Sequence, residues 1–196
     1  LSGIVRRVDE QYYTDEWAKC CLLLYKKELL QKPPLCLQRL FFRHPDKMKM
    51  FLEENPSRSF DVENDYYLPE EAYQDKRAFD CWAECLYEEF PEILGYIMGK
   101  SCNGKDGAFP HEFIREFLEK QQNEKLTKAV FYGKFNSRGA RIVQDGRTLY
   151  EQAKCYRAQA RELRLKFPQS AKILLQLAKW MESEAQHDQL EAEIVP

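Results

Sequence analysis

Residues 148–192 read TLYEQAKCYRAQARELRLKFPQSAKILLQLAKWMESEAQHDQLEA, and this stretch decides the fold. Apolar or alanine side chains recur along its first half every three or four positions, at Leu149, Ala153, Tyr156, Ala160, Leu163 and Phe167. The second half repeats the spacing at Ala171, Leu174, Ala178, Met181 and Ala185. Because an α-helix turns once in about 3.6 residues, each set forms one apolar stripe along a helix.

The dipeptide Phe167-Pro168 separates the two stripes. A residue before proline disfavours the helical region of backbone space, and proline itself suits the first position of a new helix. Two long helices joined so tightly are expected to fold back on each other in antiparallel orientation. The alanines let the two backbones approach closely. We therefore predict a hairpin made of helices over 148–167 and 168–192.

Proline placement predicts further helices upstream. Four prolines precede acidic or apolar-periodic residues, a pattern typical of helix N-termini: Pro45, Pro69, Pro91 and Pro110. We predict helices over 14–31, 35–42, 45–54, 69–90, 91–98, 110–121 and 123–132, with Gly133 ending the last. Only 59–62 and 140–143 have strand character, and neither has a partner at hairpin spacing. The predicted fold class is mostly α, a helical domain that ends in a long antiparallel hairpin.

The composition is that of a folded protein without a membrane-spanning segment. Hydrophobic residues make up 44% and aromatic residues 13% of the 196 residues, which excludes intrinsic disorder. The longest uncharged apolar run, Cys20 to Tyr25, is far shorter than the roughly 20 residues that cross a bilayer. The sequence does not start with a signal peptide, so we expect a cytoplasmic protein with no membrane partner.

Seven cysteines, an odd number, also favour a reducing compartment, because an extracellular disulfide framework is expected to pair its thiols. Four are expected to pack as small apolar side chains beside apolar or aromatic neighbours: Cys20, Cys21, Cys85 and Cys155. A metal site built from Cys81, Cys85 and a third ligand lacks the paired short spacings of structural zinc. We therefore predict neither a metal nor another cofactor.

The charges are strongly segregated although the net charge is only −2. Residues 53–92 contain 13 Asp and Glu against 3 Lys and Arg, whereas 115–172 contains 14 Lys and Arg against 6 Asp and Glu. These two segments could pair with each other, bridge to a second copy of the chain, or face different partners. We divide the chain into an N-terminal helical region, 1–108, and a C-terminal region, 109–196, which holds a basic loop over 133–147 and the hairpin.

Three features of 109–193 resemble the C-terminal region of larger uncharacterised bacterial proteins. They are Phe109-Pro110-His111-Glu112-Phe113-Ile114-Arg115-Glu116, then Gly133-Lys134-Phe135-Asn136-Ser137-Arg138-Gly139, and then the helical pair around Phe167-Pro168. The resemblance implies a bacterial cytoplasmic protein, or a C-terminal fragment of a longer one. It carries no activity and no catalytic residue.

The basic loop supplies candidate binding residues: Lys134, Asn136, Arg138 and Arg141. Three aromatic residues are interleaved with its cations, at Phe131, Tyr132 and Phe135. Arginines and aromatics together suit phosphate neutralisation and base stacking, so one hypothesis is nucleic-acid binding through 115–172. The alternative is that these charges line the solvated faces of packed helices.

A second set of residues allows a hypothesis of catalysis at the 102–116 and 134–139 loops. Lys100 and Lys105 are placed to lower the pKa of Cys102, and His111 follows at the start of a helix. His111 would act as acid or base, while Arg115, Asn136 and Arg138 would hold an anion.

The sequence contains no intact catalytic motif, and its helical stripes are complete. Our leading hypothesis is therefore a protein-protein interaction module without catalytic activity, in which a protein partner binds the hairpin and the 133–147 loop, or a second copy binds the hairpin. Nucleic-acid binding is the first alternative and an enzyme is the second.

Overall fold

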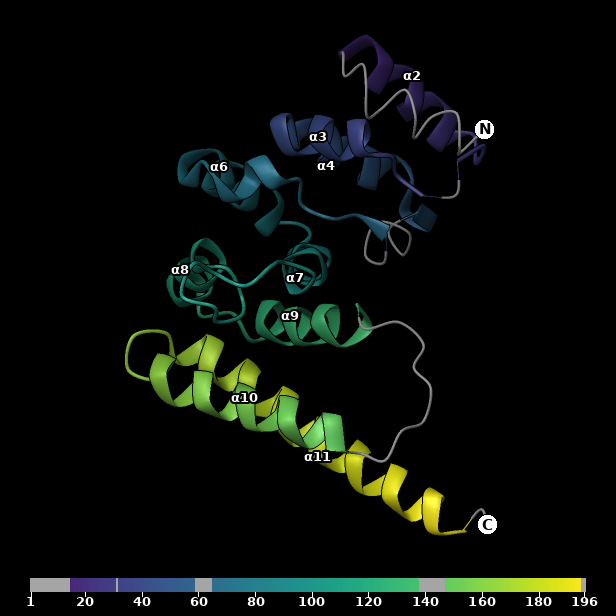
Figure 1. Ribbon diagram of the computed structural model, residues 1–196. Helices are drawn as coiled ribbons and strands as arrows, with labels where there is room; N and C mark the ends of the chain where they lie inside the picture. The colour runs from purple at the N-terminus through teal and green to yellow at the C-terminus, as the bar shows by residue number, and fades with distance from the viewer. Residues whose placement is uncertain (1–14, 31, 59–64, 138–146, 195–196) are drawn as a thin grey trace.

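The computed structural model describes residues 15–30, 32–58, 65–137 and 147–194 (Figure 1). Regular structure in these ranges is entirely helical: α2 (Asp15–Lys26), α3 (Leu35–Arg43), α4 (Pro45–Glu54), α6 (Lys76–Tyr87), α7 (Pro91–Gly99), α8 (Glu112–Gln121), α9 (Glu124–Asn136), α10 (Arg147–Leu163) and α11 (Pro168–Ile194), with short 3-10 helices at Pro56–Arg58 and Glu70–Tyr73. The mostly α prediction is confirmed. Both segments with strand character, 59–62 and 140–143, lie outside the described residues.

The helices are layered in chain order, from α2 at one end to the α10–α11 hairpin at the other (Figure 1). Buried side chains from α2 through α11 form one continuous apolar cluster, and a smaller cluster lies between α10 and α11. No helix among the described residues is both long enough and apolar enough to cross a membrane.

The antiparallel hairpin is confirmed. Every residue of the two predicted stripes is buried except Tyr156, which is partly buried. α10 ends at Leu163, four residues before the predicted end, and the amide of Phe167 donates to the carbonyl of Leu163 at 2.7 Å. The turn therefore begins before Phe167, the residue whose helical conformation Pro168 disfavours.

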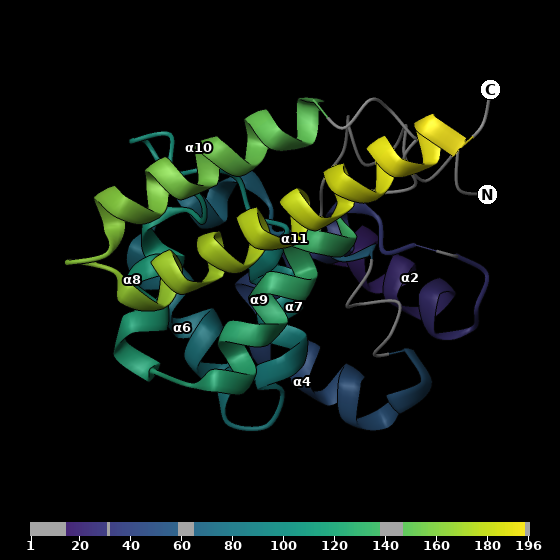
Figure 2. The ribbon, with the colours of Figure 1, turned by 90° about the horizontal axis from the view of Figure 1, so that it is seen from below.

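α11 has a second buried face that attaches the hairpin to the rest of the molecule. Ser170, Ile173 and Leu177 are fully buried on the side that contacts α8 and α9. Figure 2 shows α11 crossing over α9. Glu119 of α8 accepts hydrogen bonds from the amides of Gln169, at 2.8 Å, and Ser170, at 3.4 Å. A carboxylate at this position caps the N-terminus of α11, where the first amides have no partner within the helix.

Two predicted boundaries are wrong for local reasons. The single helix predicted over 69–90 is a 3-10 helix followed by α6, because the Asp75 side chain accepts hydrogen bonds from the amides of Arg77 and Ala78 and begins a new helix there. Gly133 does not end its helix, since α9 continues to Asn136.

Gly133 serves a close helix crossing instead. A Cβ atom on Gly133 would overlap the carbonyl oxygen of Tyr96 in α7, and one on Gly99 would overlap the carbonyl oxygen of Val130 in α9. A Cβ on Gly95 would lie 2.5 Å from the Cβ of Ala129. Glycine is thus required where the backbones of α7 and α9 touch, because atoms of the backbone cannot move aside.

We expect Gly133→Ala and Gly99→Ala each to lower the free energy of unfolding by about 1–3 kcal/mol, because each forces two packed helices apart. Urea denaturation of the full chain measures this. Gly107→Ala is the matched control, since nothing lies within 4 Å of its Cβ position and only its positive φ of 77° opposes alanine. An equal or greater loss for Gly107→Ala would contradict the crossing as the cause.

Candidate functional site

The loop between α7 and α8 folds around Asp106. The amide of Ala108 donates to Asp106 Oδ1 at 3.1 Å, and the amide of Gly104 donates to the carbonyl of Ala108 at 2.9 Å. Asp106 then forms a two-pronged ion pair with Arg115 of α8, at 2.7 and 2.8 Å. The guanidinium of Arg115 holds the pKa of Asp106 below its ordinary value.

Arg115 is enclosed by these contacts. Its exposed fraction is 1%, and its guanidinium lies 5.2 Å from the centroid of the Phe167 ring at the hairpin turn. A Cβ on Gly104 would lie 2.6 Å from Arg115 Nη2. Arg115, predicted to hold an anion in catalysis, therefore joins the loop, α8 and the hairpin turn.

His111 is also committed to the fold. It is 4% exposed, and its Nδ1 accepts a hydrogen bond from the amide of Phe113 at 3.3 Å, which caps α8. The rings of Tyr73 and Phe113 lie on either side, each with its centroid 4.8 Å from that of the imidazole. Burial lowers the pKa of His111, although the carboxylate of Glu112, 3.4 Å from Nε2, acts in the opposite direction.

Cys102 does not have the environment predicted for it. Its pKa is raised, because partial burial and the nearby charge of Glu112 disfavour the thiolate. Lys100 was predicted to lower this pKa, but its Nζ lies 4.8 Å from the centroid of the Tyr67 ring. No hydrogen bond joins Cys102 to His111 in the part of the chain that the structure describes. The predicted activation of this thiol by neighbouring lysines is therefore wrong.

The remaining cysteines divide by helix face. Cys21 is buried as predicted, and so is Cys36, whereas Cys20 and Cys155 are exposed and Cys85 is partly buried. Cys20 lies between Lys19 and Cys21, and Cys155 between Lys154 and Tyr156, and each thiol lies on the solvent side of its helix, so the apolar packing predicted for these two is wrong. Within the described ranges, no three His, Cys, Asp or Glu side chains converge as metal ligands.

The predicted basic loop over 133–147 begins as helix. Lys134 and Asn136 lie in the last turn of α9, while Arg138 and Arg141 fall outside the described residues. Lys134 Nζ lies 4.4 Å from the centroid of the Phe109 ring, at a cleft of about 440 Å³ that Asn103 and α10 also line. Asn136 is exposed and does not line this cleft.

The interleaved aromatics of α9 are mostly used in packing. Phe135 meets Trp180 of α11 with ring centroids 4.5 Å apart, and Phe131 stacks on Phe135 at 6.2 Å. Tyr132 is 48% exposed and stacks on Tyr96. This arrangement gives little support to base stacking by these three rings.

Four carboxylates of the acidic segment 53–92 pair with cations that precede the segment in the chain. Its carboxylates form ion pairs within 4 Å with α2, α3, α4 and the loop after α2: Glu54 with Lys26, Asp65 with Lys32, Glu71 with Arg39 and Arg43, and Glu89 with Lys49. Glu84 pairs with Lys120 and so links the acidic segment to the basic one. Three further cations of the basic segment pair with carboxylates outside the acidic segment: Arg115 with Asp106, Lys128 with Glu124 and Arg157 with Glu182.

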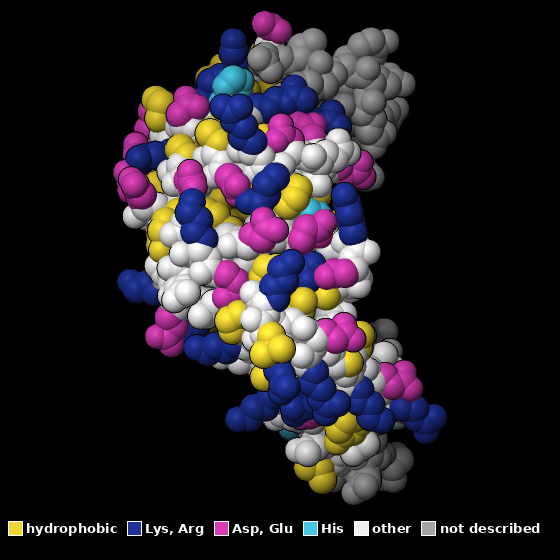
Figure 3. All heavy atoms as spheres, turned by 90° about the vertical axis from the view of Figure 1, so that its left-hand side faces the viewer, with side chains coloured by type: hydrophobic (Ala, Val, Ile, Leu, Met, Phe, Trp, Pro, Cys, Tyr) yellow, Lys and Arg dark blue, Asp and Glu magenta, His cyan; other side chains and the backbone are white. Residues whose placement is uncertain are grey.

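The cations of the hairpin face solvent. Residues 152–181 contain seven Lys and Arg and one acid, Glu162. Arg157 pairs with Glu182 at 2.6 Å, but six exposed cations have no carboxylate within 4 Å in the described part of the chain: Lys154, Arg161, Arg164, Lys166, Lys172 and Lys179. Figure 3 shows Lys and Arg side chains gathered in a band over the hairpin.

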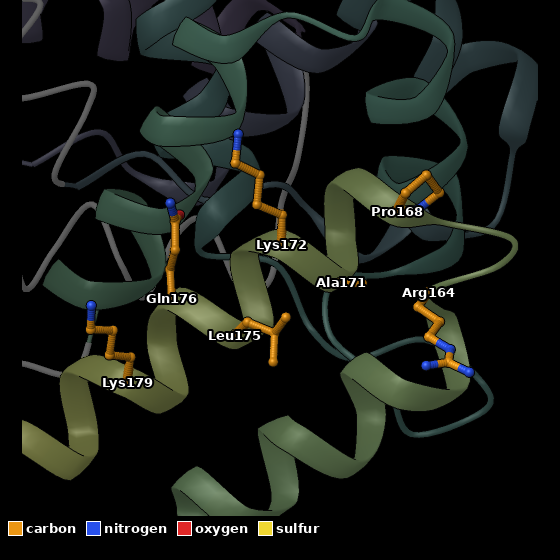
Figure 4. Close-up of a pocket in the computed structure, with 7 residues that line it drawn as sticks. All are labelled: Arg164, Pro168, Ala171, Lys172, Leu175, Gln176 and Lys179. Carbon is orange, nitrogen blue, oxygen red and sulfur yellow. The ribbon is translucent and has the colours of Figure 1, made fainter.

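A groove of about 390 Å³ runs along this band, on the outer seam of the hairpin. It is lined by Arg164 of the turn after α10 and by Pro168, Ala171, Lys172, Leu175, Gln176 and Lys179 of α11. Figure 4 shows Leu175 pointing toward α10, with Lys172, Gln176 and Lys179 on the other side of α11 and Arg164 at the end of α10. Leu175 is 45% exposed, so the groove combines an apolar floor with a cationic rim.

The sequence analysis did not predict this groove. Its signal was present as Leu175, which falls outside the apolar stripe of 171–185 and is flanked by Lys172 and Lys179 on the same helical face. A leucine on the solvent side of an amphipathic helix is uninformative until the structure shows that a hollow lies beside it.

We expect the stability of the chain to fall as the pH drops below about 6.5, the pKa of an unfolded histidine. Because the folded state keeps His111 neutral and its pKa low, the unfolded state takes up the proton first. His111→Asn retains a capping acceptor that cannot ionise, so its free energy of unfolding should vary less between about pH 7 and about pH 5.5. Urea denaturation at both pH values measures this, and His187→Asn, at an exposed position of α11, is the control. An unchanged pH slope in His111→Asn would contradict the assignment.

Comparison with known proteins finds no match among family models, curated proteins or solved structures. The features that bear on function are therefore the charges, the contacts and the cavities of the chain itself. Of these, the hairpin groove has exposed cations and an exposed apolar side chain, whereas the predicted catalytic residues His111 and Arg115 are enclosed.

Proposed function

We propose that this chain is a non-catalytic interaction module that binds a protein partner through the outer face of the α10–α11 hairpin. The observation that carries the proposal is the groove, where Leu175 is exposed between cations that have no carboxylate partner within the described residues. Apolar surface combined with charge of one sign is typical of a surface that binds a complementary macromolecule.

The contacts of the other candidates support the same choice. His111 caps α8 and Arg115 pairs with Asp106, so both side chains already have structural roles that explain their burial. A bacterial cytoplasmic setting is part of the proposal, supported by the resemblance of 109–193 and by the odd number of cysteines.

Photo-crosslinking from the groove tests the proposal. We expect p-benzoylphenylalanine in place of Leu175 to crosslink the full chain to a protein in bacterial cells, because the side chain lies in the contact surface. The same substitution at Leu23 of α2, which is 60% exposed and lines none of the grooves described above, is the control and should give no such product.

The charge of the groove provides the second half of this test. Lys172→Glu with Lys179→Glu should abolish the Leu175 crosslink, whereas Lys19→Glu with Lys27→Glu, two exposed lysines near Leu23, should leave it intact. The proposal would be overturned if position 175 gave no product beyond that from position 23, or if the product survived reversal of the groove charges.

Nucleic-acid binding is the second candidate, favoured by the band of seven cations along the hairpin. We expect only non-specific binding of duplex DNA, with a Kd of about 1 μM or weaker at physiological salt, because no aromatic side chain lines the groove. Fluorescence anisotropy with a labelled duplex measures this across salt concentrations. Nucleic acid would be the partner instead if the Kd were about 10 nM, if the affinity fell steeply as the salt concentration rose, and if this salt dependence were less steep for Arg164→Gln.

A further inference from the structure

The spacing of the charged and apolar residues that line the groove indicates the chemistry of its partner, provided that the proposed function holds. Lys172, Leu175 and Lys179 follow one another at intervals of three and four residues, so they start from one outward stripe of α11, where Leu175 turns toward α10 and both lysines turn toward the opposite edge of the helix (Figure 4). With a rise of about 1.5 Å per residue, the two lysines are about 10 Å apart along the helix axis, or two turns. Arg164, in the turn that follows α10, lines the same groove.

The groove beside the outward stripe of α11 can receive a helix of another protein. Side-chain ridges of one helix fit into grooves between neighbouring helices at axial separations of about 8–10 Å. The floor of this groove is formed by Pro168, Ala171 and Leu175, without a charged group among them. A helix lying there would cover the exposed part of Leu175 with an apolar side chain of its own.

The rim determines the charge of that helix. Arg164, Lys172 and Lys179 have no carboxylate within 4 Å among the described residues, and none of the seven lining residues is acidic. Glu182, three residues after Lys179 on α11, is paired with Arg157. An incoming carboxylate therefore meets cations that have nothing to give up in order to pair with it.

We propose that this groove binds an acidic amphipathic helix of a protein partner, whose contacting stripe presents an acid, an apolar residue and an acid within two helical turns. The two acids pair with Lys172 and Lys179, one of them within reach of Arg164, and the apolar side chain packs on Leu175. The recognition is thus a helix laid into a groove, with charge fixing its register.

Two other occupants fit less well. A second copy bound through the same groove would form a two-fold interface, which sets the lysines of one copy against those of the other. A nucleic-acid backbone would pair with the rim but would leave Leu175 in contact with phosphate or sugar rather than with an apolar surface.

A synthetic peptide tests the inference directly. The probe is an alanine-rich helix of about 20 residues, long enough to be helical in water, with Glu, Leu and Glu spaced like Lys172, Leu175 and Lys179. Fluorescence anisotropy with the full chain should show saturable binding. Replacing Leu175 by Ser should weaken it about tenfold, the effect expected from losing one buried apolar contact.

Charge exchange separates a specific pairing from general attraction. Lys172→Glu with Lys179→Glu should weaken binding of the Glu-Leu-Glu peptide at least about tenfold and should create binding of the matching Lys-Leu-Lys peptide. Lys19→Glu on α2 with Lys27→Glu just after it makes the same change in net charge and should do neither. Circular dichroism of each variant confirms that the helices are retained.

The remaining outcomes separate a failure of the acidic helix as the occupant from a failure of protein binding at the groove. No binding at about 1 mM peptide, or no rescue by the charge-exchanged pair, overturns the acidic helix as the occupant. If the Leu175 crosslink to a protein persists in that case, the proposed function stands with a partner of other chemistry. If the crosslink is also missing, both fail. Dimerisation that depends on Leu175, measured by sedimentation without peptide, overturns the inference in favour of a second copy.

Discussion

Arg115 holds three parts of the molecule together, and the position of the hairpin depends on it. Arg115 belongs to α8. Its guanidinium pairs with Asp106 of the loop before α8 and lies 5.2 Å from the ring centroid of Phe167 at the hairpin turn. Asp106 is half exposed, so solvent screens part of the ion-pair energy. The greater constraint is that a buried guanidinium without its carboxylate is costly, which fixes the loop and the turn relative to α8.

Further contacts orient the hairpin around this point. Gln159 of α10 reaches the same loop, accepting a hydrogen bond from the amide of Phe109 and donating to the carbonyl of Gly107, each at 3.3 Å. Glu119 caps the N-terminus of α11 from α8. With one face of α11 on α10 and another on α8 and α9, the outward stripe of Lys172, Leu175 and Lys179 is the face that remains for a partner.

The sequence predicts what a single helix determines for itself. Both stripes of the hairpin follow from spacing alone, because burial of one face imposes a period near 3.6 whatever the partner is. The role of Gly133 could not be predicted, since glycine ends helices and also permits close crossings, and only the position of Tyr96 in a distant helix decides between them.

At the candidate site, too, contacts with distant parts of the chain decide what the sequence alone does not. A histidine and an arginine near a helix start suggest catalysis by type, yet His111 is an acceptor for a backbone amide and Arg115 is paired through a loop nine residues away. Residue type indicates which chemistry is possible, while burial and partners decide whether it is available. The second buried face of α11 was missed because three of its members, Ser170, Ile173 and Leu177, depend on helices that precede the hairpin.

The near-neutral net charge conceals how the charges are used. Four carboxylates of 53–92 pair with cations of 26–49, yet residues 1–92 contain 19 Asp and Glu against 13 Lys and Arg, whereas residues 152–181 of the hairpin contain seven Lys and Arg against one acid. The positive potential of residues 152–181 acts over about 8 Å in physiological salt and orients an acidic partner before contact. The apolar floor acts only after contact, when Leu175 is covered, and it penalises any partner whose charges match but whose surface does not. Long-range attraction and short-range fit therefore reside on the same helix face, and neither requires the rest of the protein to move.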